Sequence, residues 1–197
     1  ILVIGGNSDI GFAICKEFIK DNFKIILASR NIAELDEKKK ILHNLSVKCE
    51  TYYFDIEDQS SYKNFFDKLR TKPDILIISC GYLEVEEKNY QKIININYLS
   101  KVNFIEDILS KKDFFNKLNS IIGISSLAGE RGKERLNIYS SAKAGFTNYI
   151  DGLRQRLHKN SINVYTVKPG FVKTKMTNNM NLNKFLIITP ERLAKKI

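Results

Sequence analysis

The sequence predicts an α/β fold that is doubly wound, with a parallel sheet covered by helices on both faces. Two observations favour it. Short apolar runs rich in β-branched residues recur along the chain, and each is nearly continuous, as is typical of strands buried on both sides. Helical patterns separate these runs, so strand and helix alternate and right-handed crossovers are expected. Ligands of such sheets bind at the carboxyl ends of the strands.

The elements follow in order from this pattern. A first strand is expected at residues 1–4, then a glycine-rich turn and an amphipathic helix at 12–20. Asn31 can cap the next helix, and Glu34 can complete a capping box. The Thr189-Pro190-Glu191 sequence starts a final helix. The remaining strands are expected at 25–28, 47–54, 74–78, 120–124 and 162–167, and the remaining helices at about 60–69, 90–110 and 137–158.

Two local motifs carry chemistry. The turn from Gly5 to Gly11 would bring backbone N–H groups and a helix N-terminus up to a pyrophosphate, although an ordinary tight turn would have the same glycines. Tyr139 and Lys143 are four residues apart on a predicted helix and so share one face. The ammonium favours tyrosinate and is expected to lower the pKa of the phenol, which makes the pair a usable proton donor and acceptor. The alternative is an unremarkable pair on a solvated helix.

Composition narrows the function classes. The chain has 197 residues and 43% hydrophobic content, enough for one sizeable core, so residues 1–197 are expected to form a single domain. No apolar run is long enough for a membrane helix, and the chain opens into a strand rather than a signal peptide. Three scattered cysteines indicate reduced thiols in the cytoplasm, and two distant histidines give no metal site. The net charge of +10 comes from lysines that lie beside acids, so nucleic-acid binding is not expected.

Taken in order, the motifs resemble those of the short-chain dehydrogenase/reductase family along the whole chain. The resemblance implies a Rossmann-type domain that binds NAD(P)(H) and transfers hydride between the nicotinamide and a carbonyl or alcohol. The matching features are the glycine turn at 5–11, Asp55 after the third strand, Asn97 on the helix after the fourth, Ser126 thirteen residues before Tyr139, Lys143, and Pro169-Gly170 after the sixth strand.

In that family the tyrosine exchanges a proton with the substrate oxygen, which implies this role for Tyr139. Ser126 would steady the same oxygen, Lys143 would bind the nicotinamide ribose and tune Tyr139, and Asn97 would hold a water through its backbone. Ser126 could instead only satisfy a strand end, and Asn97 could face solvent. The cofactor-binding residues implied by the resemblance are Gly5, Asn7, Ser8, Ile10, Gly11, Ser29, Arg30, Asp55, Ile56, Cys80, Gly81, Tyr139, Lys143, Pro169, Gly170, Val172 and Thr174.

Some positions depart from the family pattern. Ile4 replaces a threonine and Asp9 a glycine in the first turn, and Asp9 would either repel a phosphate or cap exposed N–H groups. After the fourth strand the family has Asn-Asn-Ala-Gly, whereas this chain has Ile78-Ser-Cys-Gly81. No acid ends the second strand, where Ser29 and Arg30 could bind a 2′-phosphate, so NADP(H) is favoured and NAD(H) remains possible. The alternative for Arg30 is an ion pair with Glu34.

Residues 125–139 and 169–177 resemble a bacterial branch of the family, the decaprenylphosphoryl-2-keto-ribose reductases, which act on keto-sugars carried by polyprenyl phosphate. Arg131, Lys133 and Arg135 could meet a phosphate of such a substrate, or be plain surface charges. The alternatives are a small ketone or 3-oxoacyl substrate, and a regulator that binds the dinucleotide without turnover. A regulator is disfavoured because it has no use for the proton-transfer residues.

The resemblance also bears on chain length and assembly. Family members usually continue beyond the point where this sequence stops, so a last strand and part of the substrate pocket are expected to be missing. The helix at 137–158 carries an apolar stripe, part of which resembles the family's dimer face, where this helix and the helix at 90–110 meet their copies, so a homodimer or homotetramer is expected. The stripe consists of Ala142, Phe146, Tyr149, Ile150, Leu153 and Leu157.

Overall fold

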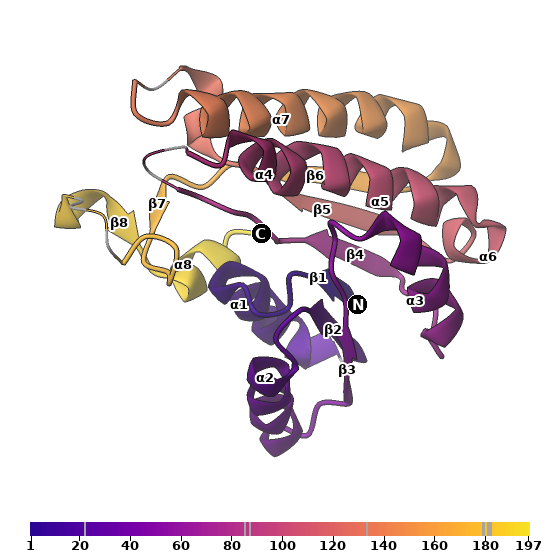
Figure 1. The fold of residues 1–197 in the computed structure, drawn as a ribbon. Helices are drawn as coiled ribbons and strands as arrows, with labels where there is room; N and C mark the ends of the chain where they lie inside the picture. Colours follow the sequence, from indigo (N-terminus) through magenta and orange to yellow (C-terminus); the bar gives the residue numbers. More distant parts are fainter. Residues whose placement is uncertain (22, 85, 87, 133, 179, 181–182) are drawn as a thin grey trace.

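A six-stranded parallel sheet forms the centre of the molecule in a computed structural model, which describes residues 1–197 apart from 22, 85, 87, 133, 179 and 181–182 (Figure 1). The strand order is β3-β2-β1-β4-β5-β6, and all five pairings are parallel. The order reverses between β1 and β4, which places a crevice at the carboxyl ends of these two strands. The strands are β1 (Leu2–Ile4), β2 (Ile25–Ser29), β3 (Cys49–Tyr53), β4 (Ile75–Ile78), β5 (Ser120–Ile124) and β6 (Asn163–Val167).

Helices cover both faces of this sheet, so the predicted single α/β domain with a doubly wound sheet is confirmed. One face carries α1 (Asp9–Glu17), α2 (Ile32–Asn44) and the short α8 (Pro190–Ala194) (Figure 1). The opposite face carries α3 (Tyr62–Lys68), α4 (Tyr90–Ile94), α5 (Ser100–Ser110), α6 (Lys112–Phe115) and α7 (Asn137–Leu157) (Figure 1). Beyond β6, β7 (Phe171–Val172) and β8 (Ile187–Ile188) form a separate two-stranded parallel sheet.

Each face of the sheet has its own hydrophobic core. On the side of α3, α5 and α7 the core is rich in aromatic rings, and the rings of Phe54 and Phe65 lie 4.3 Å apart between centroids. On the side of α1 and α2 the core is mainly aliphatic. Residues of β1 and β4 alternate between the two cores, which explains why their sequences are continuously apolar. Burying each such side chain stabilises the fold by about 1.5–3 kcal/mol.

Helix starts and stops differ in detail from expectation. The side chain of Asn31 caps α2 by accepting a hydrogen bond of 3.3 Å from the N–H of Glu34, as predicted. The Glu34 carboxylate pairs instead with Lys38 and Lys175, so the capping box is only half formed. Capping of α1 by Asp9 was wrong: Ser8 is the N-cap, and its Oγ accepts from the N–H of Gly11.

Two expectations about the long helices need correction. The helix predicted at 90–110 contains a π-helical turn, η3 (Asn95–Leu99), in which the N–H of Ser100 bonds the carbonyl of Asn95. The apolar stripe of α7 is not split between the sheet and an outer face: apart from the half-buried Tyr149, it is fully buried within the chain. Within the described residues, no helix has both the length and the apolar character needed to span a bilayer.

Candidate active site

A cavity of about 820 Å³ opens at the carboxyl ends of the strands and collects most of the predicted site residues. Two of them, Gly11 and Asn97, lie outside its lining, because both are buried behind it. Across the described residues, no cluster of histidine, cysteine or acidic side chains could hold a metal ion. The predicted residues that line the cavity are Gly5, Asn7, Ser8, Ile10, Ser29, Arg30, Asp55, Ile56, Cys80, Gly81, Ser126, Tyr139, Lys143, Pro169, Gly170, Val172 and Thr174.

The glycine turn forms the floor of one end of the cavity. Gly5 has φ +85°, and a Cβ there would lie 2.5 Å from the backbone nitrogen of Cys80, so both conformation and space require glycine. Asn7 follows, and its Nδ2 donates to the carbonyl of Asn31 at 2.8 Å. Its Oδ1 is buried with no donor among the described residues. Because a buried acceptor without a partner is costly, Oδ1 fits a ligand hydroxyl such as that of a ribose.

The residues at the other end are held by the junction of β5 and α7. Ser125 fixes the two elements together: its Oγ donates to the carbonyl of Lys143 at 3.0 Å and lies 2.7 Å from the Oγ1 of Thr147. The next residue, Ser126, starts the 3-10 turn η4 (Leu127–Glu130), and its Oγ accepts from the N–H of Ala128 at 3.0 Å. A Cβ on Gly129 would lie 2.8 Å from the backbone of α7, so glycine permits this close approach.

Ser126, Tyr139 and Lys143 thereby share one wall of the cavity. Tyr139 is 8% exposed and Lys143 4% exposed, and the Nζ of Lys143 lies 5.5 Å from the centroid of the Tyr139 ring. Burial raises the pKa of Tyr139 to about 12, and a hydrogen bond with Ser126 acts in the opposite direction. The expectation that Lys143 lowers the pKa of Tyr139 below its ordinary value is therefore wrong. Burial also lowers the pKa of Lys143 well below its usual value, which leaves less positive charge beside the phenol.

Asn97 is fully buried in η3, so it is not a solvent-facing helix residue. Its Nδ2 donates to the carbonyls of Tyr82 and Ile93 at 2.6 and 2.9 Å, and its Oδ1 accepts from the N–H of Tyr82 at 3.3 Å. These bonds tie η3 to the segment after β4. The same segment contains Gly81, whose position for a Cβ is 3.3 Å from the Oδ1 of Asn97.

Arg30 lies at the end of β2 but does not pair with Glu34. Its guanidinium group is 4.0 Å from the carboxylate of Asp55 and 3.7 Å from that of Glu57, and its side chain is 53% exposed. The Oδ1 of Asp55 also accepts from the N–H of Glu57 at 3.0 Å. Arg30 is therefore at the cavity edge, held by acids from the segment after β3.

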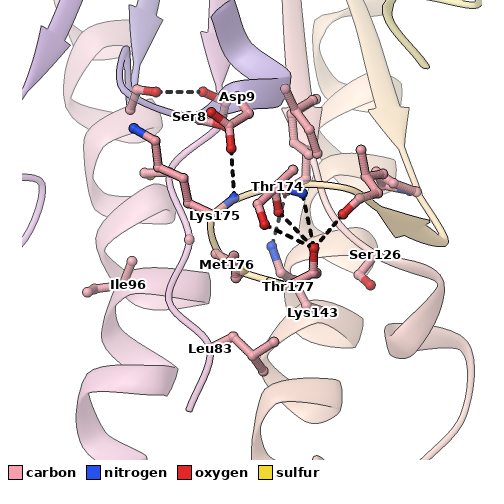
Figure 2. A pocket seen from close by; sticks show the side chains of 18 of the residues that line it. Ser8, Asp9, Leu83, Ile96, Ser126, Lys143, Thr174, Lys175, Met176 and Thr177 are labelled. Atoms are coloured by element: carbon pink, nitrogen blue, oxygen red, sulfur yellow. Dashed lines mark hydrogen bonds between the residues drawn. The ribbon is translucent and has the colours of Figure 1, made fainter. Parts of the chain in front are cut away.

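The segment after β7 closes over the glycine turn (Figure 2). The Oγ1 of Thr177 donates to the carbonyl of Val172 at 2.6 Å and accepts from the N–H of Thr174 at 3.1 Å, which folds this segment into a tight turn. The N–H of Lys175 donates to the Oδ2 of Asp9 at 2.8 Å, and the Nζ of Lys175 pairs with Glu34. Sequence reasoning missed this contact between residues far apart in the chain.

Beside Ser126 and Tyr139 the cavity wall is mainly apolar. Arg135 supplies a cation there, while Arg131 is exposed and is absent from the lining; Lys133 lies outside the described residues. Seven further apolar residues of the lining were not predicted, because their role depends on how the segments after β4, β5 and β6 fold. They are Leu83, Leu127, Leu136, Phe171, Met176, Met180 and Leu186.

Comparison with known proteins is consistent with this geometry. Residues 1–184 match the family model described as short chain dehydrogenase. The chain is 29% identical over 188 residues to a 3-oxoacyl-acyl-carrier-protein reductase of Rickettsia conorii, covering 91% of this chain and 75% of that protein.

Solved structures share the fold. A variant of actinorhodin polyketide ketoreductase with NADPH superposes with a TM-score of 0.88 at 18% identity, covering 99% of this chain and 87% of the other. A 3-oxoacyl reductase of Brucella melitensis with bound NAD superposes with a TM-score of 0.84 at 18% identity, covering 99% and 80%. The match over nearly the whole sequence shows that the chain belongs to the short chain dehydrogenase family and is an oxidoreductase.

Proposed function

We propose that the protein is an NADP(H)-dependent carbonyl reductase in which Tyr139 exchanges a proton with the substrate oxygen. The observation that carries this proposal is that Ser126, Tyr139 and Lys143 share one wall of a cavity whose other end is the glycine turn. A cavity of about 820 Å³ with both features suits a dinucleotide and a small reacting group together. When bound, the nicotinamide would supply or accept the hydride.

The residues of this chain would divide the remaining work. Tyr139, with its pKa raised by burial, keeps its proton at neutral pH and so is ready to donate it to a carbonyl oxygen. The hydroxyl of Ser126 would hold that oxygen by a second hydrogen bond. Lys143 would meet the ribose hydroxyls, and in its ammonium form it would bring the pKa of Tyr139 down. Asn97 would hold the segment with Gly81 in place through its bonds to Tyr82.

NADP(H) is favoured over NAD(H) by the cation Arg30 at the end of β2. Arg30 lines the cavity beside Ser29, its side chain is half exposed, and its two ion-pair distances are long. It can therefore turn from Asp55 and Glu57 to a 2′-phosphate at little cost, because exposed ion pairs contribute only about 0–1 kcal/mol.

Two substrate classes are supported by different features. Arg135 at the cavity wall supports a substrate with a phosphate, such as a keto-sugar carried by a polyprenyl phosphate. The apolar lining of seven residues supports a 3-oxoacyl chain, and a relative of this chain is named as a 3-oxoacyl reductase. Reductase assays with both classes and with simple ketones would separate them, since Arg135→Ala should impair only the phosphate-bearing substrate.

The test of the reaction class is Tyr139→Phe. The variant should lose turnover by about 10²–10⁴-fold because a general acid is removed, while the dissociation constant for NADPH stays nearly unchanged. Tyr165→Phe is the matched control, because Tyr165 is half exposed on β6 and lies outside the cavity lining. Full activity of Tyr139→Phe would overturn the proposal.

We also propose a cytoplasmic homo-oligomer. Cys15, Cys49 and Cys80 are free thiols, which fits a reducing compartment. Ile94 and Leu99 are exposed apolar residues near η3, on the side of the molecule where the family resemblance places the subunit contact. Light scattering of the purified protein should give a dimer or tetramer, and Leu99→Glu should shift it toward monomer.

A further inference from the structure

A second lysine lies buried beside Lys143, outside the cavity lining. Lys101 is on α5 and is 0% exposed. It shares a helix face with Phe104, Ile105 and Ile108, which all belong to the aromatic-rich core. An ammonium group in such a position is costly unless a partner compensates its charge, so its surroundings decide its state.

The two lysine side chains meet at one backbone carbonyl. The Nζ of Lys101 donates to the carbonyl of Ile124 at 3.4 Å, and the Nζ of Lys143 donates to the same oxygen at 3.3 Å. The Nζ of Lys101 also lies 4.5 Å from the centroid of the Phe146 ring on α7. None of the ion pairs found in the described part of the chain includes either lysine.

The titratable groups around the pair supply no negative charge. After β4, Cys80 faces both lysines, but burial raises the pKa of its thiol, which stays neutral. On α7, Tyr139 lies beside Lys143 and its phenol is also neutral at pH 7. On α3, the hydroxyl of Tyr62 lies within hydrogen-bond distance of the carbonyls of Ile56 and Ser100, and burial raises its pKa as well.

Two ammonium groups in this setting repel each other without compensation. Burial lowers the pKa of both lysines, and the charge of Lys101 lowers that of Lys143 further. A hydrogen bond between the two amines has opposite effects, raising the pKa of Lys101 and lowering that of Lys143. One protonated and one neutral amine satisfy this geometry. Lys101 is the better placed of the two to carry the charge, because its Nζ lies 4.5 Å from the centroid of an aromatic ring, against 5.5 Å for Lys143.

We propose that Lys101 is a positioning residue of the candidate active site, which competes with Lys143 for the single proton that the buried pair holds and so favours a neutral amine at Lys143. This inference rests on the proposed function for its consequence in catalysis. A neutral Lys143 places no positive charge beside Tyr139, so the phenol keeps its proton, as a reductase requires.

The direct test needs no turnover. In protein labelled with ¹³C at lysine Cε, an NMR titration should show one resonance with a midpoint far below the other lysines, and Lys143→Met should remove it. In Lys101→Met the midpoint of this resonance should move to higher pH, because removing a neighbouring positive charge favours the protonated amine. Lys111→Met is the matched control: its Nζ also lies near an aromatic ring, 5.0 Å from the centroid of Phe66, but outside the cavity lining. A Lys143 resonance that titrates with the other lysines, or that Lys101→Met leaves unmoved, would overturn the proposal.

Stability and activity give independent readouts. Lys101→Met replaces an uncompensated buried ammonium with an apolar chain of similar length, so its unfolding midpoint in urea should rise. The pH at which its reductase rate falls by half should be lower, because a more fully charged Lys143 lowers the pKa of Tyr139 and so removes the proton that reduction needs. If Tyr139→Phe retains turnover, the proposed function fails, and the NMR titration still decides the role of Lys101. If Tyr139→Phe is inactive but the pH profile of Lys101→Met matches that of the original protein, the inference about Lys101 alone is wrong. Should Lys101→Met not fold, the same titration of Lys101→Gln decides, because glutamine keeps a hydrogen-bond donor but removes the charge.

Discussion

The backbone N–H of Lys175 donates a hydrogen bond of 2.8 Å to the Oδ2 of Asp9, which joins the segment after β7 to the first turn of α1 (Figure 2). Asp9 stands where the related family pattern has a glycine. Its carboxylate therefore holds the segment over the cavity, although it also places a negative charge where a pyrophosphate would bind. The two effects act in opposite directions on nucleotide affinity.

Substitutions of Asp9 separate these effects. Asp9→Asn keeps an oxygen for the N–H of Lys175 but removes the charge, so it should bind NADPH about fivefold more tightly, corresponding to about 1 kcal/mol. Asp9→Ala removes both and should gain less, because the segment loses its anchor. Dissociation constants from nucleotide fluorescence at low salt provide the measurement. Weaker binding by Asp9→Asn would contradict the electrostatic argument.

The preference for NADP(H) depends on Arg30. Arg30→Ala should weaken NADPH binding about tenfold, since one charge-assisted contact to a phosphate is lost, while NADH binding should change little. Lys168→Ala is a suitable control, because Lys168 is exposed, pairs with Glu130 and lies outside the cavity lining. Equal losses for both nucleotides in Arg30→Ala would show that Arg30 does not read the 2′-phosphate.

The regular part of the fold could be predicted because it depends on local pattern. The β-branched runs that became β4 and β5 are correct to within one residue, since buried parallel strands leave a strong signal. The π-helical turn at Asn95–Leu99 could not be predicted, because nothing in its composition distinguishes it from an α-helix. The strands β7 and β8 could not be predicted either, because two residues each are too few to show an alternating or continuous apolar pattern.

For the candidate site, the sequence motifs identified the groups but not their environment. Ser126 and Tyr139 were predicted to lie together and do, whereas the effect of burial on the pKa of Tyr139 depends on tertiary packing. The burial of Lys101 could have been predicted from the sequence. Phe104 and Ile105 follow it by three and four residues, so all three lie on the helix face that packs into the core. A lysine at a predicted core position indicates a buried charge.

Asn97 should matter for stability, because its side chain satisfies both the N–H and the carbonyl of Tyr82. Asn97→Ala leaves these groups without their partner, and the free energy of unfolding should fall by about 2–4 kcal/mol. Asn103→Ala is the matched control on α5: its bond to Gln59 is exposed, so a change within about 0.5 kcal/mol is expected. Urea unfolding curves of the two variants would decide, and similar midpoints would contradict this role.

The raised pKa of Tyr139 predicts how stability changes in alkali. With a pKa of about 12 when folded against 10.0 as the ordinary value, Tyr139 keeps its proton more tightly in the folded state. Its contribution to stability is therefore fully present below pH 10 and is lost as the pH rises through 12, at up to about 1.4 kcal/mol per pH unit. Tyr139→Phe cannot titrate, so its free energy of unfolding should fall less steeply over this range. A constant difference between the unmutated protein and Tyr139→Phe from pH 9 to pH 12 would show that the phenol is not held in its neutral form by burial.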